Sequence, residues 1–181
     1  MIKKILIAVD RSQNNKLVFD TAVSLAKTTG ADLILLHVLS KKEPEHPTLP
    51  AYTYYPIVEE TNYETYQKEY AKYEQHGLEF LKNLTAEATA AGILTEYTQL
   101  AGNPGRLICE LANNWSADLI LVGSRGLKGL REMFLGSVSN YVTHHAPCSV
   151  LIVRQPTDTT KSSSASSELE EVNSELLTSD F

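Results

Sequence analysis

Unbroken runs of apolar residues alternate along this chain with segments in which apolar residues return every three or four positions. Five runs have the length and composition of strands, and they cover residues 3–10, 31–39, 93–102, 118–124 and 148–154. Three of them, "KKILIAVD", "ADLILLHVL" and "DLILVGS", are apolar almost throughout, which is typical of strands buried on both faces of a parallel sheet. The run "ILTEYTQLAG" alternates in polarity, which is also a strand pattern.

Four segments have helical spacing, and they cover residues 12–30, 62–91, 103–117 and 137–146. Ser12 is a candidate N-cap of the first helix, and Gly30 and Gly92 are stop signals for the first and second. The second helix carries an apolar stripe expected to face inward, made of Tyr66, Tyr70, Tyr73, Leu78, Leu81 and Leu84. Because strands and helices alternate, the sequence predicts an α/β fold with right-handed crossovers and one doubly wound sheet.

Two segments break this alternation of strands and helices. One lies inside the predicted domain, which covers residues 1–154, and the other follows it. Residues 41–61 are rich in proline and tyrosine and are expected to form an irregular insertion, a kind of loop that is often functional. Residues 155–181 form an acidic, serine-rich tail that we expect to be disordered. Four apolar residues of the tail are spaced like one face of a short helix, which would form only on a partner protein.

The net charge of the chain is −6, but most of it lies in the tail. Beyond residue 155, six carboxylates face a lone lysine, Lys161, so the body is close to neutral. A near-neutral body offers no clustered cations for nucleic acid or for an anionic membrane.

Cys109 and Cys148 are the two cysteines, and both lie among apolar residues, where a buried free thiol is the expected state. The N-terminal segment lacks the features of a signal peptide, and no apolar run reaches membrane-spanning length. We therefore expect a cytoplasmic protein.

The stretch "GSRGLKGLREMFLGSVSN", residues 123–140, follows the strand "DLILV" directly. Gly123 and Gly126 would let the chain turn tightly and bring backbone N–H groups close to a phosphate. Gly136 and Ser137 follow after nine further residues, at the start of the next helix, where unpaired N–H groups favour an anion. Arg125 and Lys128 would add positive charge in the same loop.

Asp10 ends the first strand, which in the usual doubly wound order lies beside the strand that ends at Gly123. Ligands of such sheets bind beyond the carboxyl ends of the strands, where the strand order reverses. A plain β–α connection with a capped helix is the alternative interpretation. The convergence of the glycines, the helix start and a carboxylate that is costly to bury favours a nucleotide site.

With these motifs the chain resembles the ATP-binding members of the universal stress protein family. Those members carry Gly-x-x-Gly, nine residues, and then Gly followed by Ser or Thr, which "GSRGLKGLREMFLGS" matches at Gly123, Gly126, Gly136 and Ser137. The similarity extends from "KKILIAVDRS" to "APCSVLIVR" and so covers most of residues 1–154. The resemblance implies a five-stranded parallel sheet in the order 3-2-1-4-5, with helices on both faces.

The resemblance also implies roles for matched residues. Asp10 would hydrogen-bond the ribose or the adenine edge, Val38 would meet adenine through its backbone, and phosphates and ribose would be held by backbone and hydroxyl donors. The expected site residues are Ala8, Val9, Asp10, Val38, Gly123, Arg125, Gly126, Gly136, Ser137 and Val138. Family members commonly form homodimers through the last strand, here residues 149–153.

These observations predict a sensor that binds ATP or another adenine nucleotide, with or without Mg²⁺. Insertion 41–61 could cover the nucleotide or contact a protein partner, and tail 155–181 is a further candidate for contact with a partner. A slow ATPase is one alternative, disfavoured because the chain shows no Walker-type lysine, no second acidic residue beside Asp10 and no obvious base. A nucleotide-free dimeric scaffold is another, disfavoured by the intact glycine pattern. His37, inside "LLHVL", is interpreted as a core or pocket-lining histidine rather than a catalytic base.

Overall fold

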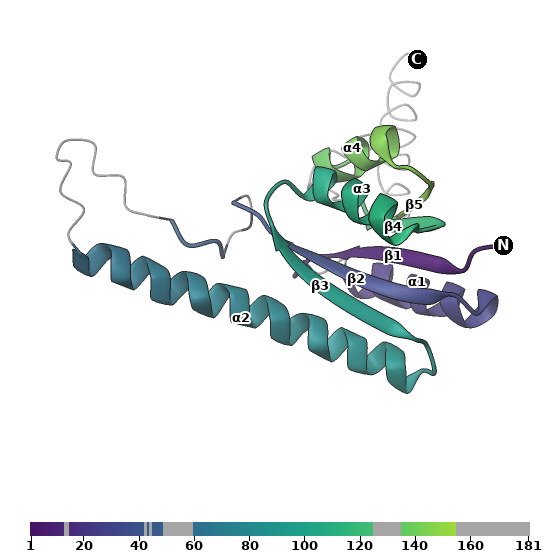
Figure 1. Ribbon diagram of the computed structural model, residues 1–181, viewed down its shortest axis with the longest axis horizontal. Coiled ribbons are helices and arrows are strands. Elements are labelled where there is room, and N and C mark those ends of the chain that lie inside the picture. Colours follow the sequence, from purple (N-terminus) through teal and green to yellow (C-terminus); the bar gives the residue numbers. More distant parts are fainter. Residues whose placement is uncertain (13–14, 42, 44, 49–59, 125–134, 155–181) are drawn as a thin grey trace, which may run out of the picture.

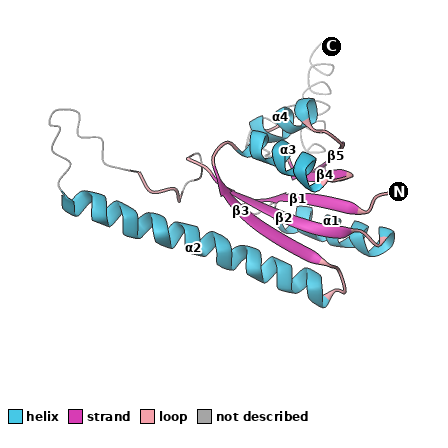
Figure 2. Cartoon of the chain, in the orientation of Figure 1, coloured by secondary structure: helices cyan, strands magenta, loops and turns pink. Residues whose placement is uncertain are grey.

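The computed structural model describes residues 1–12, 15–41, 43, 45–48, 60–124 and 135–154. Five strands form one sheet: β1 (Lys4–Val9), β2 (Asp32–Leu39), β3 (Thr95–Ala101), β4 (Leu119–Gly123) and β5 (Ser149–Val153). All pair in parallel, in the order β3-β2-β1-β4-β5. The predicted fold class and strand order are confirmed (Figure 2).

Four helices accompany the sheet: α1 (Asn15–Thr29), α2 (Glu60–Ala90), α3 (Pro104–Trp115) and α4 (Ser137–His145). Successive residues of a buried strand point to opposite faces, so β1 serves two cores. Ile5 and Ile7 pack with α1 and α2 on one face, whereas Leu6 packs with α3 and α4 on the other. The helices therefore cover both faces, as expected for a doubly wound sheet.

Glycines end the first two helices, as the sequence predicts. Gly30 has a φ of +68° and Gly92 a φ of +83°, a left-handed conformation that most other residues adopt only with strain. The helix α1 starts later than predicted: it begins at Asn15, and Ser12, the predicted N-cap, lies outside it. The second helix, expected from about residue 62, begins at Glu60.

The stripe of α2 is buried only in part. Tyr73, Leu81 and Leu84 belong to the core, whereas the other three stripe residues, Tyr66, Tyr70 and Leu78, are half-buried. For Tyr66 and Tyr70 the reason is length: α2 has 31 residues, which span about 46 Å at 1.5 Å per residue, whereas β3 has 7. Figure 1 shows the N-terminal part of α2 running past the ends of the strands, where no sheet is left to cover it.

Cys109 and Cys148 are free and half-buried, and burial raises the pKa of both thiols, which keeps them protonated. Among the helices of the described ranges, none is both long enough and apolar enough to cross a membrane.

Candidate functional site

A cavity of about 720 Å³ opens at the carboxyl ends of β1, β2 and β4. Its floor includes Val9 of β1, Val38 of β2 and Val122 of β4. In this sheet the chain moves outward from β1 to β2 and β3, and then returns to β4 on the other side of β1. The cavity therefore lies at the reversal of strand order, and its volume is in the range of small-molecule sites.

Eight of the ten predicted site residues line this one cavity: Ala8, Val9, Asp10, Val38, Gly123, Gly136, Ser137 and Val138. They come from three strands and the start of α4, so segments far apart in sequence meet in one place. Arg125 and Gly126, the other two predicted residues, lie outside the described residues.

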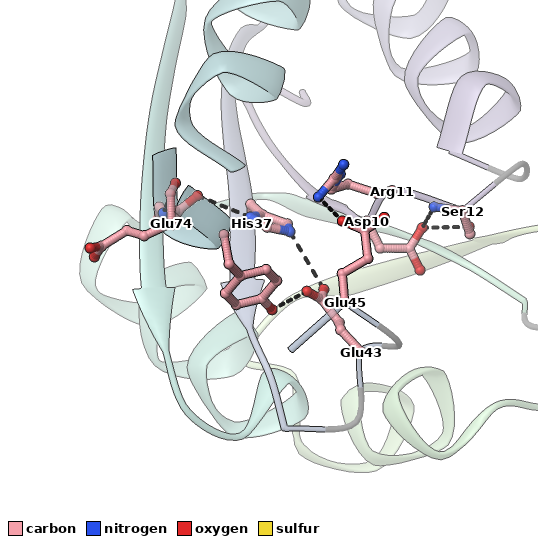
Figure 3. Close-up of polar contacts among 9 residues, drawn as sticks. Asp10, Arg11, Ser12, His37, Glu43, Glu45 and Glu74 are labelled. Carbon is pink, nitrogen blue, oxygen red and sulfur yellow. Dashed lines mark hydrogen bonds and ion pairs between the residues drawn. The ribbon is translucent and has the colours of Figure 1, made fainter. Parts of the chain in front are cut away.

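Asp10 is held at the mouth of the sheet by a local turn. Its Oδ1 accepts hydrogen bonds from the backbone N–H of Ser12, at 3.1 Å, and from the Ser12 hydroxyl (Figure 3). Ser12, predicted to cap α1, thus satisfies the carboxylate instead, while its carbonyl accepts the N–H of Asn15. A half-buried carboxylate is expensive without such donors, and these two fix its position at the cavity.

The start of α4 is tied to the end of β4 by a buried serine. The Ser139 hydroxyl donates to the carbonyl oxygen of Gly123 at 2.7 Å, and Ser139 is 2% exposed. This bond, worth about 1 kcal/mol, sets the N-terminus of the helix beside the end of the strand. Gly136, the N-cap, has φ −56° and ψ 154°, and no side chain from the described part of the chain caps the helix there.

A second helix, α3, also begins at the cavity but is capped differently. Asn103 Oδ1 accepts the backbone N–H of Arg106 at 3.3 Å, and Pro104, at the first position, lacks an N–H group. Because Asn103 already accepts one of the first N–H groups of α3 and Pro104 offers none, the start of α4, which no described side chain caps, is the better place for an anion.

Gly123 has a packing role that the sequence motif does not reveal. A Cβ atom added there would lie 3.1 Å from Cγ2 of Val18 in α1, so the absence of a side chain lets α1 pack closely on β4. Its φ is not positive, unlike that of Gly102. The close packing of α1 on β4, rather than a left-handed turn, therefore explains the glycine at this position.

Sequence reasoning named insertion 41–61 as a segment that could cover the nucleotide, but it identified none of the residues on one side of the cavity. We call this side the cavity wall; it comprises Ser40, Lys41, Glu43, His46 and Tyr70. The first four follow β2 in a segment without periodicity, and Tyr70 belongs to the stripe of α2 that was expected in the core. The only signal was the unusual density of tyrosine and proline in this region.

His37 is fully buried in β2 and does not line the cavity. The prediction of a core histidine is consistent with this position. Its polar partners are Gln99 on β3, which lies behind the cavity wall, and Glu43 of the wall itself.

Comparison with known proteins gives a family match over residues 1–154, to the model of the universal stress protein family. Universal stress protein Sll1388 of Synechocystis sp. is 36% identical over 152 residues, which cover 83% of this chain and 97% of that protein. Universal stress protein YxiE of Bacillus subtilis is 36% identical over 156 residues, which cover 85% of this chain and 100% of that protein.

Solved structures with the same fold include hypothetical protein MJ0577, with a TM-score of 0.68 and 23% identity, covering 87% of this chain and 99% of that one. A universal stress protein in complex with cAMP has a TM-score of 0.57 and 23% identity, with coverages of 86% and 98%. At3g01520 from Arabidopsis thaliana, with AMP bound, has a TM-score of 0.55 and 22% identity, with coverages of 90% and 98%.

Proposed function

We propose that this chain, which belongs to the universal stress protein family, binds an adenine nucleotide in the cavity at the ends of β1, β2 and β4. The observation that carries the proposal is the pairing, in one cavity, of a fixed carboxylate with a helix N-terminus that no described side chain caps. Structural neighbours crystallised with cAMP and AMP support the choice of adenine.

The two features suit the two ends of a nucleotide. Asp10 is an acceptor, so it favours the hydroxyl groups of ribose or the amino group of adenine and repels phosphate. The start of α4, at Gly136 and Ser137, offers N–H donors and a partial positive charge to phosphate. The nucleotide would thus lie with its base between Ala8 and Val38 and its phosphates at α4.

ATP is the nucleotide we propose, and Arg125 and Gly126 are proposed to contact its phosphates. Within the described ranges, no three His, Cys, Asp or Glu side chains gather where they could hold a metal ion. Any Mg²⁺ at this site would then be bound chiefly through the phosphates, as is usual for this ion.

We propose that the protein acts as a regulator in which ligand occupancy sets the conformation of segments near the cavity. A homodimer through β5 is part of this proposal, because β5 is an edge strand paired with β4 and its Leu151 is 36% exposed. The insertion 41–61 and the tail 155–181 are proposed contacts for a protein partner.

Isothermal titration of the full chain with ATP, ADP, AMP and GTP tests the ligand. We expect all three adenine nucleotides to bind, and GTP to bind at least about tenfold more weakly, because a site that pairs with one base leaves polar groups unpaired against another. Equal affinity for GTP, or no binding of any adenine nucleotide at millimolar concentration, would overturn the proposal. Steady accumulation of ADP during the titration would favour the ATPase alternative.

A further inference from the structure

A buried polar network lies behind the cavity wall. Nδ1 of His37 is 3.1 Å from Oε1 of Gln99 on β3, and Nε2 of Gln99 donates to the carbonyl oxygen of Glu74 in α2 at 3.0 Å. The amide of Gln99 is therefore oriented by Glu74, with its oxygen toward the histidine. An acceptor at that position requires the hydrogen of the imidazole to be on Nδ1.

The other ring nitrogen then faces a carboxylate. Nε2 of His37 is 3.5 Å from Oε1 of Glu43, at ion-pair distance, and within the described part of the chain it has no hydrogen-bond partner. In a neutral ring this nitrogen would turn a lone pair toward a carboxylate oxygen. Protonation of the ring replaces that repulsion with an attraction, so the geometry favours the charged histidine.

Glu43 is held from its other side by α2. The hydroxyl of Tyr73 donates to Oε2 of Glu43, and the side chain of Glu43 is 13% exposed. Burial, reinforced by Glu43, raises the pKa of the Tyr73 hydroxyl, which keeps it a donor. Burial alone would raise the pKa of Glu43, but its contacts with His37 and Tyr73 hold the pKa below the ordinary 4.5.

These contacts fasten the segment after β2 to the body of the protein. Besides the anchor at Glu43, the ring of His46 packs against Tyr70 and Tyr73, with centroids 5.9 and 5.5 Å apart. The two anchored residues, Glu43 and His46, both belong to the cavity wall. The polar network thus controls the shape of one side of the proposed nucleotide site.

We propose that Glu43 is a positioning residue for nucleotide binding, which holds the cavity wall in place through His37 and Tyr73 and makes nucleotide affinity depend on the charge of His37. The inference rests on the proposed function of the cavity. Asp10 links Glu43 electrostatically to the nucleotide site, because Asp10 lines the cavity and its charge acts on Glu43. A protonated His37 neutralises Glu43, whereas a neutral His37 leaves two carboxylates near an anionic ligand.

The sign of the pH dependence follows from the groups that face His37. Burial lowers the pKa of His37, but Glu43 and Gln99 outweigh burial and the nearby Arg11, so the pKa lies above the ordinary 6.5. The ion pair is therefore favoured at pH 6 and is lost as the pH rises through this raised value. Glu43, with its lowered pKa, stays charged down to below pH 4.5.

The test compares ATP affinity of the full chain and three variants at pH 6 and pH 8.5. Glu43→Ala removes the anchor and should weaken binding about three- to tenfold at pH 6, the size expected for loss of one ordinary hydrogen bond. Glu45→Ala is the matched control, because Glu45 lies two residues away, is 55% exposed and pairs with Arg11. We expect it to bind as the wild type does.

Glu43→Gln separates anchoring from charge. Its amide can donate to Nε2 of a neutral His37 and accept from Tyr73, so it should restore most of the affinity that Glu43→Ala loses. The ratio of wild-type to Glu43→Gln affinity should fall at least about twofold from pH 6 to pH 8.5 as His37 loses its charge. Because both proteins bind the same ATP, the change in the protonation of ATP with pH cancels in this ratio.

Amide hydrogen exchange without ligand provides an independent readout. Residues 40–46 should exchange faster in Glu43→Ala than in the wild type or Glu45→Ala. If Glu43→Ala does not fold, Tyr73→Phe takes its place, with a smaller effect in the same direction.

Wild-type affinity in Glu43→Ala, an equal loss in Glu45→Ala, or a ratio independent of pH would overturn the role of Glu43 and leave the nucleotide site standing. Failure of the wild type to bind ATP would instead overturn the proposed function, and this role with it.

Discussion

Replacement of Gly136 by valine is expected to weaken ATP binding at least about tenfold, while the protein still folds. Gly136 lines the cavity at the N-cap of α4, where the proposed phosphates would meet backbone N–H groups. Its φ of −56° and ψ of 154° are accessible to any residue, so valine should not strain the backbone. The added side chain would occupy space that the phosphates need, and titration calorimetry measures the loss.

The control for this substitution adds the same kind of bulk away from the cavity. Ala86 is exposed on α2, and Ala86→Val should bind ATP as the wild type does. Thermal unfolding of both variants checks that each is folded. Unchanged affinity in Gly136→Val would mean that the start of α4 does not hold the phosphates.

Replacement of Gly77 by alanine is expected to destabilise the protein by about 2 kcal/mol, although alanine is the better helix former by about 1 kcal/mol. A Cβ atom at Gly77 would lie 2.2 Å from Oε1 of Gln99 and 2.8 Å from Nδ1 of His37. Both the Gln99 amide and the His37 ring must therefore shift, which disturbs the hydrogen bond between them. Buried polar groups left unpaired cost about 1–3 kcal/mol, and overpacking adds to that cost.

Urea unfolding of Gly77→Ala, Gln99→Ala and the double variant tests whether the close contact with Gln99 causes the loss of stability. Removal of the Gln99 amide opens space beside Gly77, so the alanine should cost less in the Gln99→Ala background than in the wild type. A cost that is the same in both backgrounds would show that the close approach of α2 to β3 is not responsible. Stabilisation by Gly77→Ala would contradict the proposed packing outright.

The fold could be predicted because its signals are local. A strand buried on both faces must be apolar throughout, so β1, β2 and β4 were visible as uninterrupted runs, and positive-φ glycines marked the ends of α1 and α2. The location of the cavity followed from the same runs, since parallel strands bring their carboxyl ends to one edge. Asp10 and Gly136 could therefore be assigned to one site without coordinates.

The cavity wall could not be predicted, because tertiary contacts alone create it. Glu43 and His46 lie in a proline-rich segment with no periodicity, and nothing in its sequence indicates that it folds back onto α2. Tyr70 has the spacing of a core residue, but α2 outruns the sheet at that point and leaves it half-buried. Gly77 gave no signal either, since an isolated glycine in a helix has many explanations.

The most direct test of the nucleotide site is a titration of the ¹⁵N-labelled full chain with ATP, followed by NMR chemical shifts of the backbone amides. The proposed site predicts the largest changes at Val9, Asp10, Val38 and residues 136–138, which meet in space at the cavity. Changes centred instead on the hollow lined by Cys109, Asn113 and His145, or no changes at saturating ATP, would contradict it.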